Sequence, residues 1–74
     1  MKINIPVGTG PNTKENILKI ENKLKKKGIH FEAEWTYKME SFVPDRREWF
    51  VHLSMLKEAN NLLQKNKVEF WEGY

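Results

Sequence analysis

Two histidines and three glutamates come closest, among the residues of this chain, to a metal-binding or acid–base set. His30, Glu32 and Glu34 alternate in one segment, and Glu48 and His52 follow in another. Two imidazoles and one carboxylate can hold iron, but only where the strand register brings the rings together. The sequence does not fix that register, and it contains no nucleophile, base and acid at a recognisable spacing. We therefore predict no metal site, no small-molecule cofactor and no enzymatic activity.

The loop at residues 8–12 (Gly-Thr-Gly-Pro-Asn) is a second candidate, because it joins a predicted strand to a predicted helix. Backbone N–H groups at the start of a helix can hold an anion. The loop lacks the Gly-Lys-Ser/Thr ending of a P-loop and the three-glycine spacing of a dinucleotide-binding fold. We expect it to be an ordinary strand-to-helix turn.

Aromatic side chains on a polar surface indicate binding of another protein. Residues 29–38 alternate between apolar and polar side chains, which predicts a strand with one buried and one open face. Phe50 and Trp71 are expected on the open face of the same sheet, where a binding partner would cover them. Buried aromatics dominate interface energetics. We therefore predict a small protein-binding or regulatory module that uses this face for a partner protein or a homodimer, through Phe50, Trp71, His52 and Glu48.

Basic residues form an alternative functional surface. The chain has 13 Lys and Arg against 10 Asp and Glu, a net charge of +3, which permits nucleic-acid binding without requiring it. Lysines cluster toward the end of the predicted helix over residues 13–27, and Arg46 and Arg47 are expected to form a second basic spot. Such side chains bind phosphates without sequence preference, although a lysine-rich helix also serves solubility. The alternative is thus nonspecific nucleic-acid binding through Lys23, Lys25, Lys26, Lys27, Arg46 and Arg47.

Residues 46–53 partly resemble the ribonucleoprotein-1 octamer of the RNA-recognition motif, a family that stacks bases on sheet aromatics. Arg46 opens the stretch, and Phe50 and Val51 stand at the fifth and sixth positions. Glu48 stands where that family has an aromatic residue, the stretch contains no glycine, and Asn4 in the first strand offers no stacking ring. The resemblance is confined to these residues, and we do not assign the chain to the family.

Six elements must position these surfaces. Strands are predicted over residues 2–7, 29–38, 47–53 and 68–71. Helices are predicted over residues 13–27 and from just after Ser54, as its N-cap, to about residue 65. Asn12 or Thr13 can cap the first helix, and Gly28 can end it. A single helix over residues 46–65 is the alternative for that segment. It would place Phe50 on the polar side of the helix, so a strand followed by a helix is preferred.

The order strand, helix, strand, strand, helix, strand predicts an α+β domain of ferredoxin-like βαββαβ topology, with both helices on one face of a four-stranded antiparallel sheet. Residues 1–74 are expected to form one small domain. There is no cysteine, no apolar run long enough to span a bilayer and no signal-peptide pattern, so we expect a cytoplasmic protein without membrane contact. The predicted core comprises Ile3, Ile5, Val7, Ile17, Ile20, Leu24, Ile29, Phe31, Ala33, Trp35, Trp49, Val51, Leu53, Leu56, Ala59, Leu63, Val68 and Phe70.

Overall fold

The computed structural model describes residues 1–39 and 41–73 and contains two helices and a four-stranded sheet. The predicted α+β class and the antiparallel sheet are therefore confirmed. Two 3-10 turns, Gly10–Asn12 and Leu53–Met55, precede the two helices. The elements in chain order are β1 (Lys2–Pro6), α1 (Lys14–Lys26), β2 (Glu32–Tyr37), β3 (Pro44–Phe50), α2 (Leu56–Lys65) and β4 (Trp71–Gly73).

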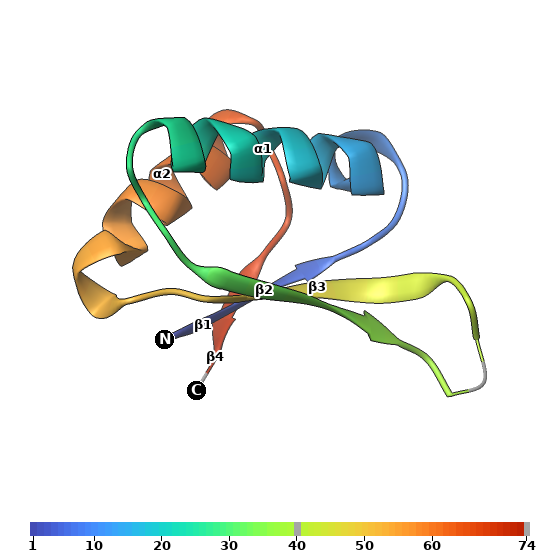
Figure 1. Cartoon of the computed structure of the whole chain (residues 1–74). Coiled ribbons are helices and arrows are strands. Elements are labelled where there is room, and N and C mark those ends of the chain that lie inside the picture. The colour runs from blue at the N-terminus through green and yellow to red at the C-terminus, as the bar shows by residue number, and fades with distance from the viewer. Residues whose placement is uncertain (40, 74) are drawn as a thin grey trace.

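The sheet has the strand order β2-β3-β1-β4, and each neighbouring pair is antiparallel. Both helices lie over the same side of the sheet, and no helix or strand of the described residues covers the other side (Figure 1). Trp49 of β3 stands between Ile3 of β1 and Ala33 of β2, on the helix side. The next row, Lys2, Phe50 and Glu32, faces the uncovered side, because successive side chains in a strand alternate.

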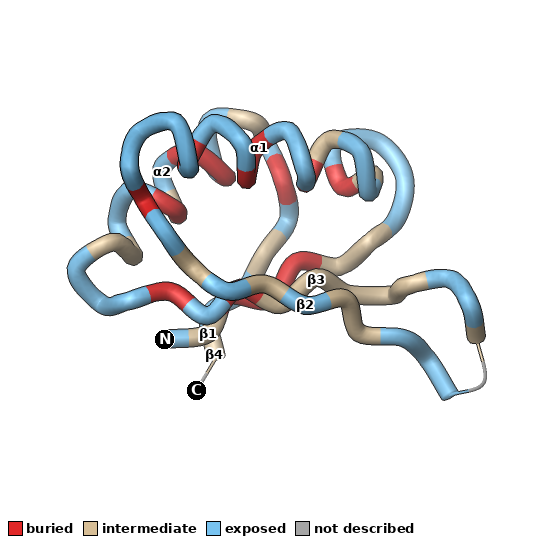
Figure 2. Tube along the Cα trace, in the orientation of Figure 1, coloured by how far each residue is buried: buried red, intermediate tan, exposed pale blue. Residues whose placement is uncertain are grey.

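The core lies between the helices and the two central strands, where the buried residues in Figure 2 gather. Trp49 is its largest fully buried side chain, and the Phe31 ring packs 4.9 Å from it, centroid to centroid. Most predicted core residues are buried. Val7, Phe31, Ala33, Leu56 and Phe70 are only partly buried against the core, and Trp35 is partly exposed outside it.

The ends of α1 follow from local sequence. Thr13 caps the helix, because its hydroxyl accepts a hydrogen bond from the Asn16 N–H at 3.3 Å. At the other end Gly28 takes a φ of +86°, which suits glycine best. The Ile29 N–H then donates to the Leu24 carbonyl at 3.0 Å, as in a Schellman motif. The helix predicted over residues 13–27 is confirmed to within one residue at each end.

A buried carboxylate joins α1 to β3, and the sequence reasoning missed it. Glu21 is almost fully buried and accepts two hydrogen bonds from the Arg47 guanidinium, at 2.7 and 2.9 Å. The Trp49 indole N–H donates to the same carboxylate at 2.9 Å. The guanidinium also lies 4.3 Å from the centre of the Trp35 ring. The negative charge of Glu21 and the positive charge of Arg47 therefore compensate each other, as their burial requires.

The third strand lies earlier than predicted. It spans Pro44–Phe50 instead of residues 47–53, so the choice of a strand over a long helix is confirmed but its bounds are wrong. His52 ends the extended segment by accepting a hydrogen bond from the Ser54 N–H at 3.2 Å. Leu53, predicted in the core, is consequently 68% exposed in the 3-10 turn. Ser54 does not cap α2, whose N-cap position is Met55.

The second and fourth strands also begin later than predicted. The Ile29 N–H is hydrogen-bonded to the end of α1, so β2 starts only at Glu32. Before β4, the Asn12 side chain donates to the Glu69 carbonyl at 3.0 Å and accepts from the Glu69 N–H at 2.9 Å. The hydrogen bonds to Asn12 thus replace pairing with a neighbouring strand at Glu69, and β4 contains only Trp71–Gly73.

We predict that Glu21→Gln lowers the free energy of unfolding by about 2–3 kcal/mol, because Arg47 keeps its buried charge without an anionic partner. Urea denaturation followed by tryptophan fluorescence measures the change. The control is Glu58→Gln, which removes an exposed ion pair with Lys27 and should cost less than about 1 kcal/mol. An equal effect of the two substitutions would contradict the role assigned to Glu21.

Candidate functional site

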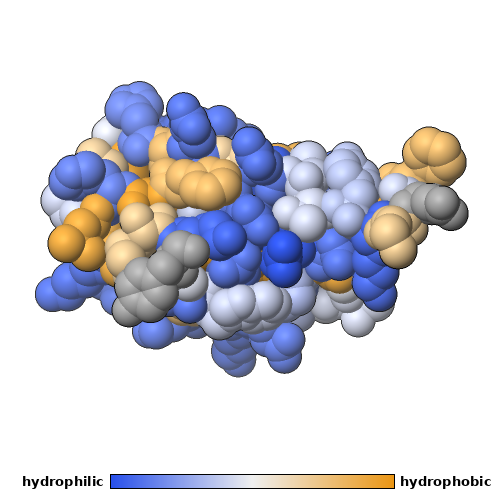
Figure 3. Space-filling view, turned by 90° about the horizontal axis from the view of Figure 1, so that it is seen from below, coloured by the Kyte–Doolittle hydropathy of each residue, from blue (hydrophilic) through white to orange (hydrophobic). Residues whose placement is uncertain are grey.

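The uncovered face of the sheet combines charged and aromatic side chains. Figure 3 views the molecule from this side and shows hydrophobic atoms toward both ends, with a hydrophilic band between them. The end on the right is the one where the β2–β3 hairpin projects, and the chain termini lie toward the left (Figure 1). Apolar side chains that no element covers are typical of binding surfaces.

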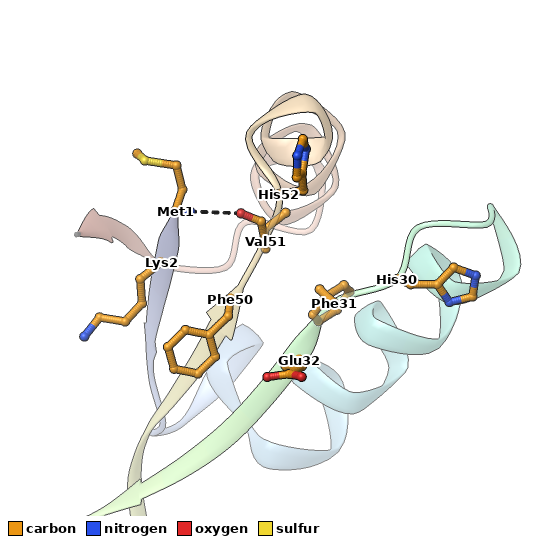
Figure 4. A pocket seen from close by; sticks show the side chains of 8 residues that line it. All are labelled: Met1, Lys2, His30, Phe31, Glu32, Phe50, Val51 and His52. Atoms are coloured by element: carbon orange, nitrogen blue, oxygen red, sulfur yellow. Dashed lines mark hydrogen bonds between the residues drawn. The ribbon is translucent and has the colours of Figure 1, made fainter.

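An open depression lies at the end of the sheet where β1 begins and β3 ends. Figure 4 shows the Phe50 ring between the Lys2 and Glu32 side chains, as the strand register requires. Met1 and Val51, which both line it, exchange two backbone hydrogen bonds, at 2.9 and 3.0 Å. We call it the Phe50 depression; its lining residues are Met1, Lys2, His30, Phe31, Glu32, Phe50, Val51 and His52.

Acidic side chains beside the depression differ in their partners. Glu48 is largely buried under Arg46, at 3.0 Å, and Lys2, at 3.9 Å. Glu32 and Glu34 are exposed, and no basic side chain pairs with either of them within the part of the chain that the structure describes. The β2 side of this face therefore presents unneutralised negative charge.

Of the four residues predicted to bind protein, only Phe50 and His52 line the depression. Phe50 is 39% exposed, and His52 is exposed at the rim, beyond the end of β3. Glu48 lies two residues before Phe50 on β3, toward the middle of the sheet, and does not line the depression. Trp71 is 50% exposed on β4, opposite Asn4, so β1 separates it from Phe50 by roughly 10 Å across the sheet. Phe50 and Trp71 are thus two separate aromatic positions.

A second apolar surface was missed by sequence reasoning. In the connection between β2 and β3, Met39 is 94% exposed, Phe42 97% and Val43 70%. We call these three residues the hairpin tip; Glu40, between them in sequence, lies outside the described residues. Their apolar type was visible in the sequence. Their exposure was not, because a connection has no periodicity that assigns its side chains to a face.

The predicted basic surface is divided by the fold. Lys23, Lys26 and Lys27 of α1 line a shallow depression together with Lys65 and Asn66 of α2, and Leu62 lies at its base. We call this the lysine depression; the exposed Lys25 does not line it.

The two arginines do not join that surface. Arg46 lies on the uncovered face beside Glu48, and Arg47 lies on the helix side against Glu21, because consecutive strand residues face opposite ways. The expectation that Arg46 and Arg47 form one basic spot is therefore wrong.

The histidine pair and the loop at residues 8–12 were the other candidates for chemistry. His30 and His52 lie on different sides of the depression (Figure 4), and the described residues contain no cluster of three or more potential metal ligands. In the loop at residues 8–12, the Asn12 side chain is buried in hydrogen bonds to Pro6 and Glu69. No helix of the described chain has the length and apolar character needed to cross a bilayer.

Comparison with known proteins gave no match to a family model, a curated protein or a solved structure. The resemblance of residues 46–53 to the ribonucleoprotein-1 octamer thus has no support from a family model.

We predict that Phe50→Ser reduces binding of a neutral apolar dye such as Nile red, because it removes the central ring of the depression. The free energy of unfolding should fall by only about 1–2 kcal/mol, since the ring is already partly in water. Dye fluorescence and urea denaturation measure the two effects. Trp71→Ser is the control and should leave most of the dye signal; a larger loss from Trp71→Ser would show that the depression is not the apolar site.

Proposed function

We propose that this chain is a protein-binding module without catalytic activity, and that the Phe50 depression is its binding site. The observation that supports the proposal most is the Phe50 ring, 39% exposed on the side of the sheet that no helix or strand of the described chain covers, in a depression that Phe31 and Val51 of the core also line. Aromatic side chains in partly desolvated hollows contribute most of the binding energy at protein interfaces. Polar residues surround this hollow, which is the usual arrangement of an apolar centre and a polar rim.

The charges beside the depression indicate the chemistry of the partner. Glu32 and Glu34 favour a basic group on the partner, whereas Glu48 is already paired with Arg46 and Lys2. A partner segment with one apolar side chain for the hollow and a lysine or arginine beside it would satisfy both features. The strands beneath are hydrogen-bonded through three neighbouring pairs, so little ordering is needed upon binding.

We further infer that the fold is ferredoxin-like. Three features support this assignment: the order of helices and strands, the sheet order β2-β3-β1-β4 with antiparallel neighbours, and both helices over one side of the sheet. In such an arrangement each helix connects two strands that are separated by a third. The opposite side of the sheet is thereby left free for a partner.

We predict that a photoreactive p-benzoylphenylalanine at position 50 crosslinks to protein in the native host, because a partner covers this ring. The matched control is the same residue at position 18, since Leu18 on α1 is 37% exposed and Phe50 is 39% exposed. Mass spectrometry of the adducts, after nuclease treatment, identifies the partner. Adducts of equal yield from both positions, or none from position 50, would refute the proposal.

Nucleic-acid binding is the second candidate function, and the lysine depression supports it. The ends of both helices contribute ammonium groups to one surface, and only Lys27 has an acidic neighbour there, Glu58 at 3.7 Å, among the residues that the structure describes. Closely spaced lysines bind successive phosphates through counterion release. Arg47 would take no part, because Glu21 occupies its guanidinium.

If this second function holds, Lys26→Gln combined with Lys65→Gln should weaken binding to single-stranded DNA. The slope of log affinity against log salt should also become shallower by about 1–2, one unit for each lost phosphate contact. Mobility-shift titrations across salt measure both. Lys19→Gln with Lys57→Gln removes the same charge from the same two helices as a control. Indistinguishable slopes for the two double variants, or no binding at low salt, would exclude the lysine depression as a nucleic-acid site.

A further inference from the structure

The hairpin tip is unusual because its apolar side chains project from the body of the molecule. Phe42 and Met39 are almost completely exposed, although water disfavours such side chains. The turn also satisfies backbone groups internally. The Ser41 N–H donates to the Lys38 carbonyl at 3.0 Å, and the Val43 N–H donates to the Ser41 hydroxyl at 3.1 Å. These two N–H groups would therefore stay paired if the turn entered an apolar hollow.

The hollow and the tip lie at opposite ends of the molecule. Figure 1 shows the β2–β3 connection at one end and the start of β1, beside the Phe50 depression, at the other. The molecule is about twice as long as it is thick, with extents of 35 × 25 × 18 Å. One copy cannot place its own tip in its own depression, because the same rigid sheet separates them. A second copy can.

We propose that the Phe50 depression receives the hairpin tip of a second copy of this chain, so that molecules associate head to tail. The inference rests on the proposed function and names the occupant of that site. Phe42 and its two apolar neighbours would cover the exposed Phe50 ring and the partly exposed Phe31 of the next copy. Lys38, at the base of the tip, can pair with the exposed Glu32 at the rim, while the two basic groups of the lining already have partners: Lys2 pairs with Glu48 at 3.9 Å, and the Met1 ammonium donates to the Val51 carbonyl.

The size of the contact makes this association weak and reversible. An aromatic side chain buries roughly 150–250 Å². Three apolar side chains and their rim thus give a total interface near the lower limit of specific contacts, about 1,000 Å². The contact is also heterologous, because different surfaces of the two copies meet. Such contacts produce rings or open chains whose average mass grows with concentration.

Complementation between two variants tests this geometry. Phe42→Asp removes the aromatic side chain of the hairpin tip and leaves the depression intact. Phe50→Ser removes the central ring of the depression and leaves the hairpin tip intact. Neither side chain is buried, and circular dichroism verifies that both variants fold. Leu18→Asp, on the outer side of α1, is the control. Sedimentation equilibrium from about 10 µM to 1 mM measures average mass relative to the 8.9 kDa monomer.

The wild type and Leu18→Asp should show masses that rise with concentration, and each of the other two variants alone should associate at least about tenfold more weakly. An equimolar mixture should form a one-to-one dimer and nothing larger, because it retains a single intact pair of surfaces. A monomeric wild type, association unaffected by Phe42→Asp, or a mixture that forms no dimer would overturn the inference. Crosslinks from position 50 to a different protein would still support the proposed function in each of those cases.

Discussion

The Glu21 carboxylate fixes which way the central strand β3 faces. It accepts hydrogen bonds from Arg47 and Trp49, two residues apart on one side of the strand, and thereby fastens α1 to that side. Glu48 and Phe50 must then face away from the helices, because strand side chains alternate. A slip of β3 by one residue would expose Trp49 and bury Phe50, and would leave Glu21 without its donors. The residues that form the proposed binding surface therefore depend on a contact made on the opposite side of the sheet.

Elements defined by local signals were predictable. Thr13 and Gly28 delimit α1, and the poor helical placement of Phe50 correctly favoured a strand followed by a helix. The role of Glu21 was also visible in principle. It stands four residues after Ile17 and three before Leu24, and thus on the buried side of α1. It was overlooked because a charged residue is usually assigned to the surface by its type, whereas its spacing places it among the core residues.

Features that depend on contacts distant in sequence were not predictable. The start of β4 is delayed by Asn12, which bonds to Glu69 across 57 positions of the chain. The end of β3 depends on a side-chain cap at His52 that no periodicity indicates. The exposure of the hairpin tip likewise follows from where the sheet ends in space. For the candidate site, the sequence identified Phe50 and His52, but the separation of Phe50 from Trp71 required the register of β1.

The most direct test of this account is a set of nuclear Overhauser contacts and indole exchange rates in the wild-type protein. The Phe50 ring should show contacts to the Lys2 and Glu32 side chains and none to α1 or α2, and the Trp49 indole proton should exchange slowly because Glu21 holds it. Contacts from the Phe50 ring to either helix, with a rapidly exchanging Trp49 indole, would contradict the orientation of β3 and the location of the proposed binding surface.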